Sequence, residues 1–194
     1  EISLGLVGSE MCIRDRFVYT NHPTAELFIN GKSYGKQSKN NSSLKNRYRL
    51  MWMDAIYEPG EIKVVAYNKD GKAVAEKIVR TAGKPHHIEL VSNRNELTAD
   101  GKDLAYITVK VVDKDGNLCP ADSRQINFSV KGAGKYRAAA NGDPTNLEQF
   151  HLPKMHTFNG MLTAIVQSGE TAGEIVLTAK ASGVKAGNIR IQTK

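Results

Sequence analysis

The chain has 194 residues, with 27 Lys and Arg against 20 Asp and Glu, and its net charge is +7. Its 40% hydrophobic and 24% charged residues are typical of a folded globular protein and exclude a disordered chain. No apolar run reaches the ~20 residues of a membrane helix, and the basic residues are spread over both halves, so we expect neither a membrane span nor a nucleic-acid partner.

Residues 1–16 show no helix or strand periodicity and lack the basic and apolar regions of a signal peptide. The run over residues 6–15 (LVGSEMCIRD) resembles the translation of a transposon-end adapter used in sequencing libraries. We therefore expect residues 1–16 to be a non-native leader and the natural N-terminus to be missing. Cys12 is then not a candidate for any catalytic or metal-binding role.

From residue 17 onward, short alternating segments are separated by turns. The turn signals are Asn30-Gly31, residues 58–60 (EPG) and residues 68–71 (NKDG), and Asn-Gly is the strongest short hairpin signal. The predicted strands cover residues 17–20, 25–29, 33–36, 48–53, 61–67 and 74–79. These segments predict one β module over residues 17–82.

Residues 81–85 (TAGKP) are the best linker candidate, because Gly and Pro together stop a strand. A second module is expected over residues 83–194. Its predicted strands alternate apolar and polar residues and cover residues 88–91, 106–111, 126–130, 162–166, 174–179 and 187–192. About seven strands at this spacing are typical of an immunoglobulin-like sandwich. No segment has helical spacing, so we predict an all-β chain of two tandem antiparallel β-sandwich modules.

The sequence contains no evident pair of catalytic carboxylates, and Glu148 lies in an expected loop. The histidines lack zinc spacing, and the adjacent His86 and His87 would point to opposite faces of an extended strand. Residues 113–117 (DKDGN) resemble a calcium loop, but glycine stands at the fourth position, so a hairpin turn is expected. Cys119 has no neighbouring base in the sequence. We predict no catalytic residue, no metal site and no cofactor.

Aromatic residues around Trp52 and Tyr57 are candidates for sugar binding, because sugar rings stack on exposed aromatic faces. In an extended strand, Tyr48, Leu50 and Trp52 would share one face. Burial in the sandwich is the default for such a set, and a sugar platform is the alternative. Trp52 and Tyr57 are therefore predicted as substrate-binding residues in the alternative case.

Polar turn residues are densest at residues 141–145 (NGDPT) and 158–160 (FNG). Loops at one end of a sandwich often carry function, which makes Asn141 and Asp143 the other two predicted substrate-binding residues. Asx turns that simply join strands are the structural alternative for these same residues.

The order of several motifs resembles that of a known enzyme family. Residues 26–33 (ELFINGKS), 57–61 (YEPGE) and 66–72 (AYNKDGK) resemble the β module that follows the catalytic barrel in family 2 glycoside hydrolases of the bacterial β-galactosidase type. Residues 97–104 (LTADGKDL) and 158–168 resemble the immunoglobulin-like last domain of those enzymes. The resemblance covers nearly all of residues 17–194, although Ala138 to Ala140 stand where a glycine-rich approach to Asn141 is expected.

This resemblance implies a retaining glycoside hydrolase that releases galactose or a related sugar and is exported to the periplasm or cell surface. The sugar-binding domain, the central sandwich and the (β/α)8 barrel with its two catalytic Glu residues have no counterpart in this chain. The chain is therefore expected to be a non-catalytic accessory region whose partner is the catalytic barrel of the same parent chain.

Two alternatives remain open at this stage. One is a stand-alone carbohydrate-binding module, which would make glycan a direct partner of this chain. The other is a segment of a bacterial adhesin, since immunoglobulin-like domains often build surface proteins. The coding sequence upstream of Phe17 discriminates the accessory region from the adhesin, because it encodes a barrel in the first case and more immunoglobulin-like units in the second.

Overall fold

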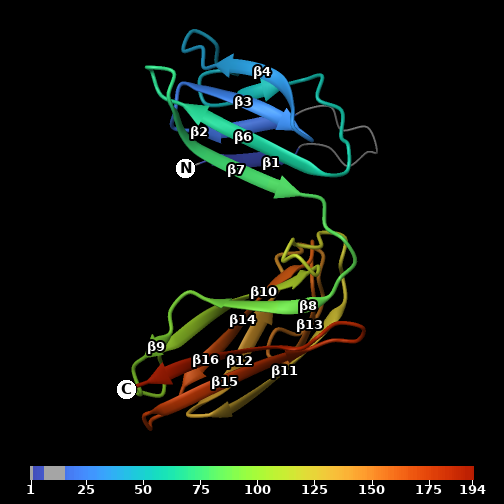
Figure 1. Cartoon of the computed structure of the whole chain (residues 1–194). Coiled ribbons are helices and arrows are strands. Elements are labelled where there is room, and N and C mark those ends of the chain that lie inside the picture. Colours follow the sequence, from blue (N-terminus) through green and yellow to red (C-terminus); the bar gives the residue numbers. More distant parts are fainter. Residues whose placement is uncertain (1, 7–15) are drawn as a thin grey trace. The chain divides into compact units, whose positions relative to one another are not determined.

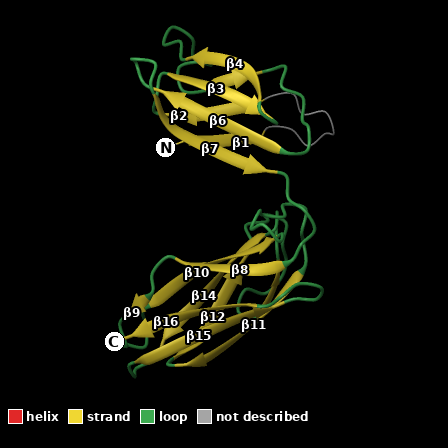
Figure 2. Cartoon of the chain, viewed as in Figure 1, coloured by secondary structure: helices red, strands yellow, loops and turns green. Residues whose placement is uncertain are grey.

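The computed structural model describes residues 2–6 and 16–194, and within them it contains strands and turns but no α-helix (Figure 2). The chain divides into two compact units, Glu1–Thr81 and Ala82–Lys194, which we call the N-terminal unit and the C-terminal unit. Each unit packs two β-sheets around its own core. The predicted all-β class is confirmed.

The N-terminal unit has a three-stranded and a four-stranded sheet (Figure 1). The first has the order β1 (Ile2–Leu6), β2 (Arg16–Thr20) and β5 (Leu50–Trp52), and the second has the order β4 (Lys32–Ser38), β3 (Thr24–Ile29), β6 (Glu61–Tyr67) and β7 (Ala73–Arg80). Burial alternates along β3, where Ala25, Leu27 and Ile29 are buried. The period of two places these side chains on the core face of the sheet.

The hairpin between β3 and β4 confirms the Asn-Gly signal. Asn30 and Gly31 have φ angles of 49° and 81°, so both lie in the left-handed region. A two-residue hairpin turn of this kind matches the right-handed twist of the flanking strands, and Asn and Gly adopt it at the lowest steric cost.

Residues 1–16 show no strand periodicity, yet part of this segment forms a strand. Residues Ile2–Leu6 form β1, which pairs with β2 in antiparallel register, and Arg16 begins β2. Backbone pairing with the edge of an existing strand requires no side-chain alternation, which is why the pattern gave no signal. The adapter interpretation concerns residues 6–15, and residues 7–15 of that run lie outside the described part of the chain.

The C-terminal unit is a sandwich of a four-stranded and a five-stranded sheet (Figure 1). The first has the order β12 (Gly134–Ala140), β14 (Met161–Ser168), β10 (Leu104–Val112) and β8 (His87–Ser92), and the second has the order β13 (Lys154–His156), β11 (Gln125–Gly132), β15 (Gly173–Lys180), β16 (Gly187–Thr193) and β9 (Glu96–Leu97). These pairs are antiparallel apart from the short parallel contact of β9 with β16.

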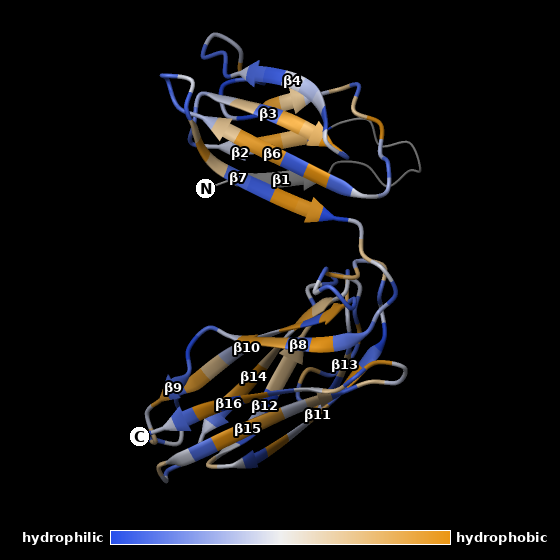
Figure 3. Ribbon diagram, viewed as in Figure 1, coloured by the Kyte–Doolittle hydropathy of each residue, from blue (hydrophilic) through white to orange (hydrophobic). Residues whose placement is uncertain are grey.

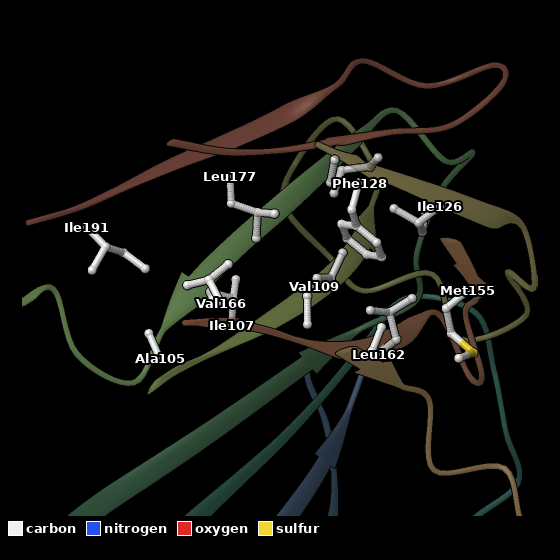
Figure 4. Packing of buried hydrophobic residues seen from close by; sticks show 14 of the residues in the cluster. Ala105, Ile107, Val109, Ile126, Phe128, Met155, Leu162, Val166, Leu177 and Ile191 are labelled. Carbon is white, nitrogen blue, oxygen red and sulfur yellow. The ribbon is translucent and has the colours of Figure 1, made fainter. Parts of the chain in front are cut away.

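Apolar side chains from both sheets fill the centre of this sandwich. Ile107 and Val109 of β10 and Leu177 of β15 are fully buried, and Figure 4 shows them among the packed side chains of the core. The apolar and polar residues alternate along the strands in Figure 3, as expected where one face of each sheet is buried and the other is solvated.

Three strands of this unit were not predicted: β9, β12 and β13. In β12 the register shifts between Tyr136 and Ala138, and this bulge breaks the period of two on which the prediction depends. The strand β13 spans only Lys154–His156 and is defined by its pairing with β11. Such short segments carry too little periodicity for a sequence pattern to detect.

The connection from β12 to β13, which we call the 141–153 loop, crosses from one sheet of the sandwich to the other. Ala140 at the end of β12 pairs with Thr163 near the start of β14, and Val112 at the end of β10 pairs with His87 at the start of β8. Because the start of β14 also pairs with the end of β10, this loop lies at the same end of the unit as the start of β8. Irregular loops of this length are uncommon in compact domains and are frequently functional.

Candidate functional site

The four predicted substrate-binding residues belong to two different units. Trp52 and Tyr57 lie in the N-terminal unit, whereas Asn141 and Asp143 lie together in the 141–153 loop of the C-terminal unit. No single unit therefore contains the whole set.

Trp52 is part of the core of the N-terminal unit and is only 4% exposed. Its indole Nε1 donates a hydrogen bond to the carbonyl of Gly35 at 3.0 Å, which links β5 to β4. Leu50 is buried on the same face, but Tyr48 precedes β5 and is exposed, so the expectation that all three share one face is wrong for Tyr48. The strand is too short to include Tyr48, and a buried indole offers no free face for a sugar ring.

Tyr57 is 46% exposed and lies in the segment between β5 and β6. Its hydroxyl lies 3.0 Å from Oγ1 of Thr81, and the same Oγ1 accepts a hydrogen bond from the backbone N–H of Gly60. These contacts fasten the 57–60 turn to the end of β7. Glycan binding by Tyr57 stays a prediction.

Other aromatic rings of the N-terminal unit are covered by cations. The Lys36 ammonium lies 4.0 Å from the ring centre of Tyr67, and Lys63 lies 5.0 Å from that of Phe28. Glu26 accepts hydrogen bonds from the Tyr67 hydroxyl and from Ser33, and these bonds, with that from Ser33 the strongest, lower the pKa of Glu26. These ring faces already hold cation–π partners.

Asn141 begins the 141–153 loop and uses its side chain in three hydrogen bonds. Its Nδ2 donates to the backbone carbonyl of His156 at 3.0 Å. Its Oδ1 accepts from the backbone N–H of Asp143 at 3.1 Å and from the side chain of Asn146 at 3.3 Å. Asn141 thus forms an Asx turn and also ties the loop to β13.

Asp143 continues the same arrangement. Its Oδ1 accepts hydrogen bonds from both the backbone N–H and the hydroxyl of Thr145, each at 2.8 Å. Asn146 repeats the motif, because its Oδ1 accepts from the backbone N–H of Glu148 at 2.9 Å. Three successive side-chain turns therefore fix the backbone of the loop. Substrate binding by Asn141 and Asp143 stays a prediction.

Glu148 and His156 close the loop, and the sequence did not identify them as a pair. One oxygen of Glu148 accepts from the backbone N–H of His156 at 3.0 Å, and the other lies 2.9 Å from its ring Nδ1. Burial raises the pKa of Glu148, but the contacts with His156 outweigh burial and lower it overall. Residues this far apart in sequence give no local spacing that would reveal the pair.

The end of the 141–153 loop covers the free edge of β12. The backbone carbonyl of Phe150 accepts a hydrogen bond from the N–H of Ala139 at 2.9 Å, and the Tyr136 hydroxyl donates to the carbonyl of Leu152 at 2.7 Å. Burial raises the pKa of Tyr136 to about 12. An edge strand that is covered in this way is protected from pairing with another chain.

The predicted turn at residues 113–117 also organises this end of the unit. The Asp113 carboxylate accepts hydrogen bonds from the backbone N–H groups of Gly83, Asp115 and Asn117 and from the Asn117 side chain. The bond from Gly83 contributes most to lowering the pKa of Asp113 to about 2. Both carboxylate oxygens are therefore occupied by groups of the protein itself.

The histidine expectation needs a correction. His86 and His87 do not point apart, because His86 precedes β8 and the strand alternation does not apply to it. Their Nδ1 atoms lie 3.0 Å apart and their rings meet edge to face.

Across residues 2–6 and 16–194, no group of three or more His, Cys, Asp or Glu side chains is placed to hold a metal ion. Cys119 is buried, which raises its pKa.

A hollow of about 530 Å³ lies in the C-terminal unit, lined by Gly101 and by residues 132–135 and 168–171. Its lining includes one carboxylate, that of Glu170. Glycine is required beside it, since a Cβ at Gly132 would lie 1.9 Å from the backbone oxygen of Glu174. Close backbone packing explains this glycine without a ligand.

Comparison with known proteins decides the family. Residues 88–190 match the family described as glycoside hydrolase family 2 C-terminal domain 5. The chain belongs to this family. Residues 16–75 match a second family, a domain of unknown function.

Curated relatives and solved structures extend this assignment over both units. The chain is 39% identical over 176 residues to a β-galactosidase of Bacteroides ovatus and 28% identical over 172 residues to a β-glucuronidase of Formosa agariphila. These matches cover 91% and 87% of this chain but 20% and 17% of the relatives.

A glycosyl hydrolase family 2 member from Bacteroides cellulosilyticus has a similar structure, with a TM-score of 0.82 and 35% identity over 93% of this chain and 23% of that chain. A β-glycosidase from Bacteroides vulgatus gives a TM-score of 0.86 at 27% identity, over 98% of this chain and 24% of that one. The chain thus corresponds to the C-terminal accessory region of family 2 glycoside hydrolases, and it spans a minor part of their length.

Proposed function

We propose that this chain is the accessory region of a retaining β-galactosidase of family 2 and that it supports the catalytic (β/α)8 barrel of the same polypeptide. The observation that carries this proposal is the 39% identity to the Bacteroides ovatus β-galactosidase over 91% of the chain. The identity to the Formosa agariphila β-glucuronidase is lower, at 28%. A β-galactoside is therefore the preferred substrate class of the parent enzyme.

A supporting role agrees with the use of polar side chains in the C-terminal unit. Asn141, Asp143 and Glu148 bond to neighbouring loop and strand groups, and Asp113 bonds to the residues that lead into β8. Such contacts stiffen one end of a sandwich. A rigid module is suited to holding a neighbouring domain in place.

We further infer that the parent enzyme acts in the periplasm or at the cell surface and that, within the expected leader at residues 1–16, the adapter-like run at residues 6–15 does not belong to the natural protein. Residues 2–6 and 16–194 include no helix long and apolar enough to traverse a lipid bilayer. Sequencing the gene upstream of Phe17 tests both inferences, since a signal peptide and a barrel are expected there and the run at residues 6–15 is expected to be absent.

The experiment that tests the function compares the parent enzyme with the 194-residue chain. The parent enzyme is expected to hydrolyse an aryl β-galactoside faster than an aryl β-glucuronide, and the chain alone is expected to hydrolyse neither above the buffer rate. A parent enzyme that prefers the glucuronide would contradict the substrate class. Hydrolysis by the chain alone would contradict the accessory role.

Direct glycan binding is a second candidate function, favoured by the exposed ring of Tyr57. It predicts that the chain binds galactan oligosaccharides in calorimetry and that Tyr57→Phe, which keeps the ring, retains this affinity while Tyr57→Ala loses it. Flat titrations across a panel of galactans would eliminate this candidate.

A further inference from the structure

The 141–153 loop reverses the usual arrangement of a surface loop. The side chains of Asn141, Asp143 and Glu148 bond to the protein, whereas Leu147 and Phe150 are 96% and 55% exposed. A single exposed leucine is ordinary on a protein surface. Two large apolar side chains on one loop, presented by polar groups that face inward, are not explained by the stability of the loop itself.

The backbone that carries these two side chains is also held in place before any partner arrives. Leu147 lies between Asn146, which accepts from the N–H of Glu148, and Glu148, which accepts from the N–H of His156. The carbonyl of Phe150 is fixed by Ala139. Such preorganisation reduces the entropy that is lost when a surface is bound.

We propose that Leu147 and Phe150 insert into an apolar recess on the catalytic region of the parent polypeptide and so dock the C-terminal unit onto it. This inference rests on the proposed function, because it takes the catalytic region as the partner. The relatives carry this region within chains about four to five times longer, of which the match covers 20% and 24% in the first two. A tethered partner is present at a high effective concentration, so a small contact suffices.

The small apolar area of these two side chains favours a tethered partner over a second copy of the chain. A fully buried aromatic side chain removes about 150–250 Å² from solvent, and Phe150 is only 55% exposed to begin with. A stable interface between separate molecules needs about 1,000 Å² or more. A sugar ligand is also disfavoured, because the polar groups that would orient it are engaged within the loop.

Hydrogen–deuterium exchange tests this inference by comparing the 194-residue chain with the parent enzyme, whose activity on an aryl β-galactoside is measured in the same preparation. Backbone amides of residues 147–150 are expected to exchange about tenfold more slowly in the parent enzyme than in the chain. In the parent enzyme, Leu147→Ser and the double variant Leu147→Ser/Phe150→Ser are expected to restore fast exchange and to lower the melting temperature.

The matched control is Leu44→Ser, since Leu44 is an exposed leucine on a loop of the N-terminal unit. This substitution is expected to change neither exchange at residues 147–150 nor the melting temperature. In the 194-residue chain, Leu147→Ser is expected to leave the melting temperature unchanged, which separates docking from a folding defect.

The outcomes are distinguishable. Equal exchange in an active parent enzyme and in the chain would overturn the docking inference and leave the proposed function intact. An inactive parent enzyme with a protected loop would support docking and overturn the galactosidase assignment. A chain that dimerises in sedimentation experiments and becomes monomeric with Leu147→Ser would identify a second copy as the occupant and overturn the inference.

Discussion

Two long loops of this molecule each expose a leucine, but they are held in different ways. The 39–49 loop joins β4 to β5 in the N-terminal unit. Its first residue, Lys39, donates hydrogen bonds to the carbonyls of Thr20 and Pro23, whereas Asn46 and Arg47 bond to Ser43 and Asn41 within the loop. Leu44 on this loop is 82% exposed. Leu44 therefore lies in a part of the loop whose hydrogen bonds connect residues of the loop itself.

The 141–153 loop is instead bonded to the strands around it. Asn141 reaches the carbonyl of His156 in β13, and the carbonyl of Phe150 accepts from Ala139 in β12. Its leucine is therefore presented from a defined position on the sandwich. The two loops thus differ in where they are attached, since the 39–49 loop is held by Lys39 at its start and the 141–153 loop is held on both sides of its leucine. Attachment on both sides makes the 141–153 loop the better docking element.

The largest expected effect concerns the base of the 39–49 loop. Trp52→Ala removes a buried indole and its hydrogen bond to Gly35, which joins the two strands that the loop connects. We expect a loss of about 3–5 kcal/mol in the free energy of unfolding of the N-terminal unit. Urea denaturation followed by circular dichroism measures it. A loss below about 1 kcal/mol would contradict the assignment of Trp52 to the core of this unit.

A smaller effect is expected from the anchor of the other loop. Asn141→Ala removes three hydrogen bonds and should cost about 1–2 kcal/mol, because the groups of His156 and Asp143 lose their partners. Asn41→Ala is the matched control, since Asn41 is exposed and supplies its backbone carbonyl to Arg47. Equal melting temperatures for the two variants would remove the distinction between the two loops.

Acid should destabilise the C-terminal unit, because the carboxylates of Asp113 and Glu148 brace the end that carries the 141–153 loop. The folded-state pKa of Asp113, about 2, lies below its ordinary value of 3.8. Asp113 therefore contributes stability that is present above that ordinary value and is lost as the pH falls towards its folded-state pKa. Glu148, whose pKa is also lowered, contributes in the same direction.

The measurement is the melting temperature of the C-terminal unit as a function of pH, from about pH 5 to about pH 2. Asp113→Asn should make the melting temperature less dependent on pH. The part of the pH dependence that comes from Glu148 should remain. An unchanged slope in Asp113→Asn would contradict the assignment of the low pKa to this carboxylate.

The smallest effects are expected from the two exposed leucines. In the 194-residue chain, Leu44→Ser and Leu147→Ser should each change stability by less than about 0.5 kcal/mol, because neither side chain is buried. Differential scanning calorimetry measures both. A clear loss in only Leu147→Ser would mean that this side chain packs within the chain, against the docking role.

Local chemistry predicted much of the fold. The alternation in β10 and β15 and the Asn30-Gly31 hairpin were read from neighbouring residues alone, because side-chain period and turn conformation are local properties. The strand β12 was missed because its bulge at Tyr136 interrupts that period. The strand β13 was missed because it exists through its pairing with β11.

The candidate site was predicted less completely. The sequence identified Asn141 and Asp143 as dense turn chemistry, but the partner of Asn141, His156, lies on another strand, so the anchoring of the loop was not visible. Trp52 was identified as either core or platform, and its burial follows from which face of β5 meets the other sheet. Distant partners and burial are properties of the assembled sheets.

The sequence by itself determined the all-β class, the turn positions and the resemblance to a family 2 accessory region. Side-chain periodicity and turn conformation depend on residues close in sequence, and the resemblance depends on the order of the motifs. Only the tertiary structure decided which polar side chains bond inward and which apolar ones remain exposed. That outcome depends on contacts such as Glu148 with His156, which form when separate strands are brought to one end of the sandwich.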